Sequence, residues 1–298
     1  MRAVVLGAAA GGGFPQWNCC CRNCRAVREN VEGFLPRTQS SLAVSADGKR
    51  WAVLNASPDI REQINLTQAL HPTGLRASPI ASVLITNGDL DHIAGLLTLR
   101  EKQPFKLFVT REIADILAAN PIFRALDAGC VEQTCVGLEE EFELLPDVKA
   151  RLFAVPGKVP LYAETGEVKT DIEGEQTVGV EIDGGDEKAY YIPGCAKMTR
   201  QVAERLAGAP LVFFDGTVWR EDEMQRAGVG AKTGTRMGHM AMSGAQGSIE
   251  AFAELGVERK IFIHINNTNP VLDPASAERR AAEEAGWEIG YDQMELSW

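Results

Sequence analysis

Two aspartates and a histidine, Asp89, Asp91 and His92, follow an apolar run in the first half of the sequence. The stretch over residues 81–96, ASVLITNGDLDHIAGL, predicts a buried strand and then a helix over residues 92–100. In an open α/β sheet, polar groups at the carboxyl end of a strand lie where ligands bind. A carboxylate beside an imidazole offers oxygen and nitrogen ligands to one cation, which indicates a metal site. The alternative is that one aspartate only caps the helix.

Four cysteines within residues 19–24 form a second group of residues that could bind a metal or react. The spacing of Cys19, Cys21 and Cys24 lets three thiolates converge on one tetrahedral ion in a loop over residues 17–24. Cys20, between two ligands, is expected to face away. The pattern predicts a structural Zn(II), and reduced, buried or redox-active cysteines are the alternative. The local sequence does not fix a fourth ligand.

His264 ends the apolar strand expected over residues 260–264. It should therefore emerge at the carboxyl end of a strand, on the same sheet edge as His92, although a single histidine at a strand end is often an ordinary buried residue. In this context the sequence favours Asp91, His92 and His264 as ligands of one metal.

The order of the remaining elements predicts a layered α/β fold with helices outside, and no Pro/Ser-rich linker divides it. We expect one domain over residues 1–298, made of two similar units. Strands are expected over residues 2–7, 41–46, 51–56, 106–110, 150–155, 177–183, 188–193 and 211–215. Helices are expected over residues 59–70, 111–119, 198–207, 243–255 and 274–285, a tight turn over residues 7–13, and a solvated acidic loop or turn over residues 139–141.

The composition excludes several classes of protein. A formal net charge of −11 opposes nucleic acid or an anionic membrane surface as the main partner. No window of 18 apolar residues predicts a membrane-spanning helix, and the N-terminus lacks the apolar core of a signal peptide. We therefore expect a cytoplasmic protein, with its oligomeric state left open.

The motif around the central aspartates resembles that of the metallo-β-lactamase superfamily, whose αββα sandwich carries His-x-His-x-Asp-His after its central strand. This sequence keeps the second half of the motif, Asp91 and His92, while Asn87 and Asp89 replace the first two histidines. His264 matches the final histidine of the superfamily.

The same resemblance covers essentially the whole chain and shows two further replacements. Lys158, in Val-Pro-Gly-Lys, takes the place of a third histidine, and Cys195, in Pro-Gly-Cys, that of a bridging aspartate. If Lys158 is protonated and points inward, its charge opposes a second cation. One metal should remain, in a two-His-one-carboxylate set that both non-haem Fe(II) oxygenases and zinc hydrolases use.

Within the superfamily, the sequence is similar to the pyrroloquinoline quinone (PQQ) biosynthesis protein B family, through FPQWNCCCRNC, GDLDH, YIPG, FFDGT, MGHM and HINNTNP. This similarity implies an Fe(II)-dependent, oxygen-using hydroxylase of the tyrosine ring of a Glu-Tyr unit from a precursor peptide, with other PQQ-pathway proteins as possible partners. It also supports the structural zinc. A related phosphodiesterase branch completes that site with a histidine where this chain has Asn267, so Asn267 is only a possible ligand.

Further polar residues have expected roles around this site. Asp89 could be an added ligand, a hydrogen-bond partner of a ligand or a proton acceptor, and Asp215 could orient a ligand histidine. His239 resembles the histidine of the Gly-His-Ser-Thr loop in the tRNA-processing branch, so acid/base chemistry and a plain loop role are both open. Lys232 and Arg236 could bind the carboxylates of an acidic dipeptide or lie in solvent.

Two other functions remain open from the sequence. A non-enzymatic carrier that assists transport of PQQ or its precursor to the periplasm would bind its ligand without turnover. A zinc-dependent hydrolase would need two metals, which the replaced ligands oppose.

Overall fold

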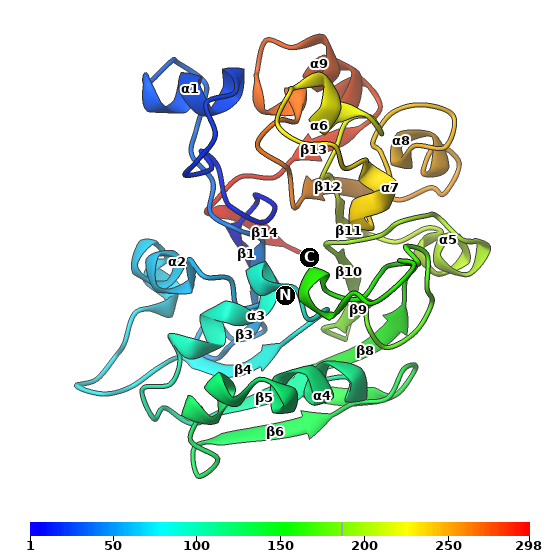
Figure 1. Cartoon of the computed structure of the whole chain (residues 1–298). Coiled ribbons are helices and arrows are strands. Elements are labelled where there is room, and N and C mark those ends of the chain that lie inside the picture. Colours follow the sequence, from blue (N-terminus) through cyan, green and yellow to red (C-terminus); the bar gives the residue numbers. More distant parts are fainter. Residues whose placement is uncertain (186) are drawn as a thin grey trace.

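Two β-sheets pack face to face between helices in the computed structural model, which describes residues 1–185 and 187–298 (Figure 1). The apolar core between the sheets includes Val5 and Leu84 of one sheet and Val180, Phe213 and Ile261 of the other. Further apolar clusters lie between each sheet and its covering helices. This arrangement confirms the predicted layered α/β class and the αββα sandwich.

The first sheet has the strand order β14-β1-β2-β3-β4-β5-β6. The first three neighbouring pairs are antiparallel and the next three are parallel. Because β14 pairs with β1, the two chain ends lie side by side (Figure 1). The strand bounds are β1 (Arg2–Gly7), β2 (Ser41–Ser45), β3 (Trp51–Leu54), β4 (Ile80–Leu84), β5 (Phe105–Val109), β6 (Val131–Cys135) and β14 (Met294–Ser297).

The second sheet has the order β13-β12-β11-β10-β9-β8-β7. Counted from β7, three antiparallel pairs are again followed by three parallel pairs, so both sheets have the same pattern of strand directions. The strand bounds are β7 (Glu141–Leu145), β8 (Val148–Ala154), β9 (Val178–Asp183), β10 (Lys188–Ile192), β11 (Leu211–Asp215), β12 (Arg259–Ile263) and β13 (Trp287–Ile289).

Helices on the two outer faces bury their apolar sides against the sheets. Ile60 of α2 and Ile113 of α4 pack on the first sheet, while Val202 of α5 and Phe252 beside α8 pack on the second. The helices are α1 (Arg22–Arg28), α2 (Ile60–Leu66), α3 (Leu90–Ile93), α4 (Arg111–Ala119), α5 (Arg200–Leu206), α6 (Glu223–Arg226), α7 (Gly234–Met237), α8 (Ser248–Ala251) and α9 (Ala277–Glu284). Short 3-10 helices are η1 (Gln68–Leu70), η2 (Ala94–Leu97), η3 (Pro121–Ala125), η4 (Leu161–Ala163) and η5 (Pro270–Leu272). None of the helices in the described residues is long and apolar enough to cross a membrane.

The helix predicted over residues 92–100 is wrong in its start and its type. The α-helix begins at Leu90 and stops at Ile93, where the 3-10 helix η2 takes over. The carbonyl of His92 accepts the N–H of Ala56, and the N–H of Gly95 donates to the carbonyl of Ala56, both at 2.8 Å. These bonds to another segment replace those that would have continued the α-helix.

Two further predictions were wrong in extent or type, and one strand was missed. Of the helix expected over residues 243–255, only α8 is α-helical, because residues 243–247 form a turn in which Gly247 lies against the carbonyl of Ser243. The acidic stretch over residues 139–141 is not all loop, since Glu141 is the first residue of β7. Its carboxylate forms an ion pair of 2.7 Å with Lys149 of β8. Strand β6 was missed because four of its five side chains are exposed or polar, so it has no apolar alternation.

Candidate metal centre

Asp91, His92 and His264 come together where the two sheets meet. Asp91 and His92 lie in α3, after β4 of the first sheet, and His264 directly follows β12 of the second. One ligand atom from each residue lies within 4.8 Å of the other two. The Asp91 Oδ2 atom is 3.1 Å from His264 Nε2 and 3.7 Å from His92 Nε2. The three side chains therefore form a two-His-one-carboxylate cluster.

Asn87 fixes the orientation of the His92 ring. Its Oδ1 atom lies 2.8 Å from His92 Nδ1 and also accepts the backbone N–H of Asp89 at 2.9 Å. Because an amide oxygen only accepts, Nδ1 carries the proton and Nε2 keeps its lone pair. His92 Nε2 is buried and has no hydrogen-bond partner among the described residues, and burial lowers the pKa of His92 to about 4. A neutral imidazole with a buried lone pair fits a metal ligand.

Thr217 plays the corresponding role for His264. The Thr217 hydroxyl lies 2.6 Å from Asp215 Oδ1, a carboxylate that can only accept, so it donates there. Its oxygen then accepts the proton of His264 Nδ1 at 2.8 Å. The remaining nitrogen, Nε2, faces Asp91. Burial opposes the charge of His264, but the hydrogen bond and the charge of Asp91 outweigh this and raise the pKa of His264 above its ordinary value. Both candidate histidine ligands thus direct Nε2 towards one carboxylate.

Asp215 and His239 form a buried pair next to this cluster. Asp215 Oδ2 accepts His239 Nδ1–H at 2.7 Å and the backbone N–H of Cys195 at 2.9 Å. Burial opposes the charge of Asp215, but His239 outweighs this and lowers the pKa of Asp215 below its ordinary value. The His239 ring stacks on His264 with centroids 5.0 Å apart, and the three residues are a second possible metal-binding group. His239 Nε2 is left free to handle a proton.

The two aspartates of the motif differ in electrostatics. Burial opposes the charge of Asp91, yet His92 and His264 hold its pKa well below the usual range. Burial, and then the charge of Asp91, raise the pKa of Asp89. Asp89 occupies the N-cap position of α3, but its side chain makes no capping hydrogen bond there, so the plain capping alternative fails for it. Gly11 of the N-terminal turn lies against the Asp91 side chain, because a Cβ at Gly11 would be 3.3 Å from Asp91 Cγ.

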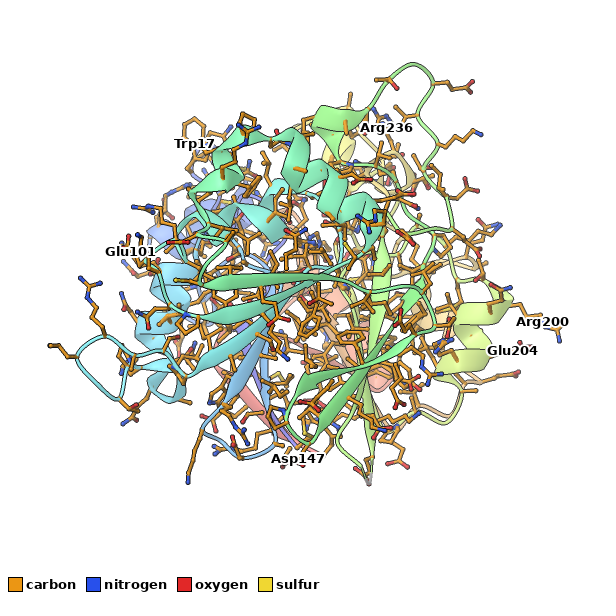
Figure 2. The ribbon with its side chains drawn as sticks, turned by 90° about the horizontal axis from the view of Figure 1, so that it is seen from below. Trp17, Glu101, Asp147, Arg200, Glu204 and Arg236 are labelled. Atoms are coloured by element: carbon orange, nitrogen blue, oxygen red, sulfur yellow. The ribbon has the colours of Figure 1, made fainter. Side chains whose placement is uncertain are left out.

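Lys158 and Arg236 lie together at the rim of the site. Both form ion pairs with Glu164: Lys158 Nζ is 3.2 Å from its carboxylate and Arg236 Nη2 is 2.8 Å from it. No sequence pattern marks Glu164. The hydrogen bond from Arg236 lowers the pKa of Glu164 to about 2. Lys232 is exposed and has no ion pair within the described part of the chain. Figure 2 shows Arg236 on the same side of the molecule as the exposed Trp17.

The sulfurs of Cys19, Cys21 and Cys24 form the second candidate metal site, with the three Sγ atoms within 4.8 Å of one another. Cys20 is exposed. Asn267 Nδ2 lies 3.2, 3.6 and 3.2 Å from the three sulfurs. A ligand oxygen of a tetrahedral zinc with Zn–S near 2.3 Å would lie roughly 3.5 Å from each sulfur. The amide end of Asn267 therefore lies about where a fourth ligand atom would lie, and a 180° flip of the amide would put Oδ1 there.

One positioning residue, Asn55, could not be found from the sequence. It follows β3 with a φ of 63°, is fully buried, and its Oδ1 accepts the backbone N–H of Thr86 at 2.9 Å. Its Nδ2 donates to Thr86 Oγ1 at 3.0 Å. Since Thr86 immediately precedes Asn87, Asn55 holds the start of the loop that carries the metal cluster. A single asparagine after a strand has no distinguishing spacing, so no sequence pattern marks this role.

Comparison with known proteins shows the family to which the chain belongs. Residues 50–265 match the family model described as "Beta-lactamase superfamily domain". The chain is 54% identical to "Coenzyme PQQ synthesis protein B" of Rhizobium meliloti (strain 1021), covering 99% of this chain and 97% of that one. It is 55% identical to the protein of the same name from Methylobacterium nodulans, covering 99% of each.

Solved structures give the same result. "The 1.98-angstrom crystal structure of Zn(2+)-bound PqqB from Methylobacterium extorquens" covers all of both chains at 50% identity with a TM-score of 0.99. A diphosphatase from the PhnP family has a TM-score of 0.69 at 20% identity over 100% of this chain and 97% of its own, which shows a shared fold. With half or more of its residues identical over nearly its full length, the chain belongs to the coenzyme PQQ synthesis protein B family of the β-lactamase superfamily.

Proposed function

We propose that Asp91, His92 and His264 hold one Fe(II), and that the protein hydroxylates the tyrosine ring of a Glu-Tyr unit derived from a precursor peptide during PQQ biosynthesis. The carrying observation is that both imidazoles keep Nε2 directed at the single carboxylate of Asp91. Two neutral imidazoles and one carboxylate leave coordination positions open for oxygen and substrate. The names of the relatives support the pathway.

The residues at the neighbouring, altered positions support a single metal. Asn87 uses its amide oxygen to orient His92, and Lys158 brings an ammonium group into contact with Glu164. Cys195 is fully buried, and its Sγ lies 3.2 Å from the carbonyl of Lys197. A two-metal hydrolase needs ligands for a second cation close to the first, and these three side chains are engaged elsewhere.

The proposed reaction replaces a ring C–H of tyrosine with C–OH. It consumes one O2, two protons and two electrons from an added reductant such as ascorbate, and it releases one water. Iron, when bound, would supply the oxygen activation that side chains lack. His239 contributes as a base, because Asp215 fixes its Nδ1–H and leaves Nε2 to accept the phenolic proton. Asp89, whose pKa is raised by burial and by the charge of Asp91, is a further proton acceptor in this proposal.

A structural zinc at Cys19, Cys21 and Cys24 forms the second part of the proposal. Asn267 would complete the tetrahedron through Oδ1, which the positions of the three sulfurs around its amide support. The zinc reported for the relative from Methylobacterium extorquens agrees with a family that binds this metal. Zinc at this site would anchor the loop that begins at His264.

Reconstitution of the apo protein tests the proposal directly. Metal-free protein is loaded without oxygen with Fe(II) or Zn(II), then given Glu-Tyr, ascorbate and O2. We expect a mass gain of one oxygen atom on the dipeptide with Fe(II) only. Product with zinc and not iron would overturn the iron assignment, and tight binding without product under both conditions would favour the carrier function.

Asn87→Ala is expected to weaken metal binding at this centre by about 10- to 100-fold, as loss of a partner that orients a ligand does. The substitution removes the acceptor of His92 Nδ1–H, which is buried and cannot turn to water. Iron titration followed by ultraviolet absorption measures the affinity. Asn65→Ala, at an exposed asparagine, is the matched control. Unchanged iron affinity in Asn87→Ala would show that His92 is not a ligand.

A further inference from the structure

The segment over residues 158–171, here called the strap, lies against the loop of the metal centre. It leaves the sheet after β8 and returns at Ile172, where Gly157 and Ile172 exchange backbone hydrogen bonds of 3.0 and 2.8 Å. The Tyr162 hydroxyl donates to the carbonyl of Gly88 at 2.6 Å. A Cβ at Gly88 would lie 2.9 Å from Pro160 Cγ, so glycine allows the strap to approach this closely. The strap therefore contacts the residue between Asn87 and Asp89.

Glu164 of the strap is bound by two cationic side chains. Arg236 donates to both of its oxygens, at 3.1 and 2.8 Å, and Lys158 Nζ lies 3.2 Å from Oε1. The side chains of Glu164 and Lys158 are only 9% and 10% exposed, whereas that of Arg236 is 38% exposed. One carboxylate is thus enclosed by two cations, and solvent reaches the group from the side of Arg236.

Arg236 lies outside the strap, and Lys158 is its first residue, next to the paired Gly157, whereas Glu164 lies within the irregular part of the strap. The stem of Lys158 packs against Gly238, where a Cβ would lie 3.1 Å from Lys158 Cγ, and Gly238 precedes His239. Arg236 lies in α7, whose first turn is capped by the Thr233 hydroxyl. Within the described strap, η4 (Leu161–Ala163) is the regular element, and no strand pairing holds Glu164 in place. The guanidinium group of Arg236 can donate the same pair of hydrogen bonds to another carboxylate.

We propose that Lys158 and Arg236 form a subsite for a carboxylate of the ligand, and that Glu164 occupies this subsite until the ligand replaces it. The proposal rests on the proposed function only in taking an acidic, tyrosine-containing dipeptide as the ligand. Exchange of one carboxylate for another costs little electrostatically, because the cations stay paired before and after binding. The subsite would also discriminate against neutral ligands, because a ligand without a carboxylate cannot displace Glu164 from Lys158 and Arg236.

Calorimetric binding to the zinc-loaded protein, without oxygen, tests the subsite. Three ligands are compared. Glu-Tyr has both a side-chain and a C-terminal carboxylate, Gln-Tyr lacks the side-chain carboxylate, and Glu-Tyr amide lacks the C-terminal one. The natural chain should bind Glu-Tyr about tenfold more tightly than one of the two amides. Arg236→Met should lower the affinity for Glu-Tyr about tenfold and remove that preference, and Arg236→Lys, which keeps the charge without the fork, should fall between. Glu164→Ala and Glu164→Gln should each bind Glu-Tyr about fivefold more tightly.

Arg200→Met is the matched control, because Arg200 forms an exposed pair with Glu204 on a different part of the surface (Figure 2). Thermal melts show that each variant is folded. A preference among the three ligands that survives Arg236→Met, or weaker binding by both Glu164 variants, would overturn the subsite. Absence of hydroxylation would refute the proposed function and leave these binding results intact. Wild-type KM for Glu-Tyr in a hydroxylating Arg236→Met protein would refute the subsite alone.

Discussion

Asp91→Asn is expected to empty the candidate iron site and to reduce tyrosine hydroxylation by more than about 100-fold, because loss of an outer partner alone costs 10- to 100-fold. The Asp91 carboxylate lies within 3.7 Å of both imidazole Nε2 atoms, so a cation bound by the two rings must meet it. Asparagine keeps the shape and one oxygen but loses the charge that offsets the cation. Metal analysis should fall from two ions per chain, one at each candidate site, to one, held by the cysteines.

Asp222→Asn is the control for this experiment. Asp222 is half-exposed and pairs with Arg226 one helical turn away, an interaction of a kind that contributes little to stability. Its replacement should leave both the metal content and the rate unchanged. An Asp91→Asn protein that binds iron with the natural affinity and keeps its rate would exclude the Asp91, His92 and His264 centre.

The sequence allowed the candidate centre to be located because strand ends carry much of the information. His92 and His264 both follow apolar strands, as predicted. The predicted shared sheet edge was wrong, because β4 belongs to the first sheet and β12 to the second, and the face-to-face packing of the two sheets brings these strand ends together. The structure places the two rings 5.4 Å apart, in a T-shaped arrangement. The resemblance to the superfamily motif predicts that Asn87 takes the place of a histidine. Its actual contact, a hydrogen bond to His92 five residues later, depends on the curvature of the loop after β4 and could not be read from spacing.

What the sequence did not provide are contacts between distant, chemically ordinary residues. Thr217 acts on His264 across 47 positions, and Glu164 pairs with Arg236 across 72. A threonine or glutamate in an irregular segment has no periodicity, so its partner is defined only by the tertiary fold. Strand β7 was missed for a related reason, since its pairing with β8 outweighs the weak strand preference of a glutamate-rich segment.

Cys21→Ser is expected to remove the structural zinc and to lower the melting temperature by roughly 5–10 °C, since a lost zinc ligand costs a few kcal/mol in a chain of this size. Cys20→Ser, one position earlier, should do neither, because Cys20 is exposed whereas the Cys21 sulfur lies beside Asn267. Cys21 is a better target than the fully buried Cys24, where serine would place a hydroxyl in an apolar core and destabilise the protein even without zinc. Zinc content and calorimetric melts measure the two effects.

The same substitution should also weaken iron binding at the other site. Asn267 lies three residues after His264, and Ile265 between them is fixed to the N-terminal turn through its N–H to Ala8 and its carbonyl to Ala10, both at 2.9 Å. Loss of zinc frees the Asn267 end of this short segment. The backbone of His264, which has a φ of 54°, is then less firmly fixed, so its ring is less well positioned for a metal. Equal losses of stability in Cys20→Ser and Cys21→Ser, or full zinc retention in Cys21→Ser, would show that the three thiols pack as ordinary buried cysteines.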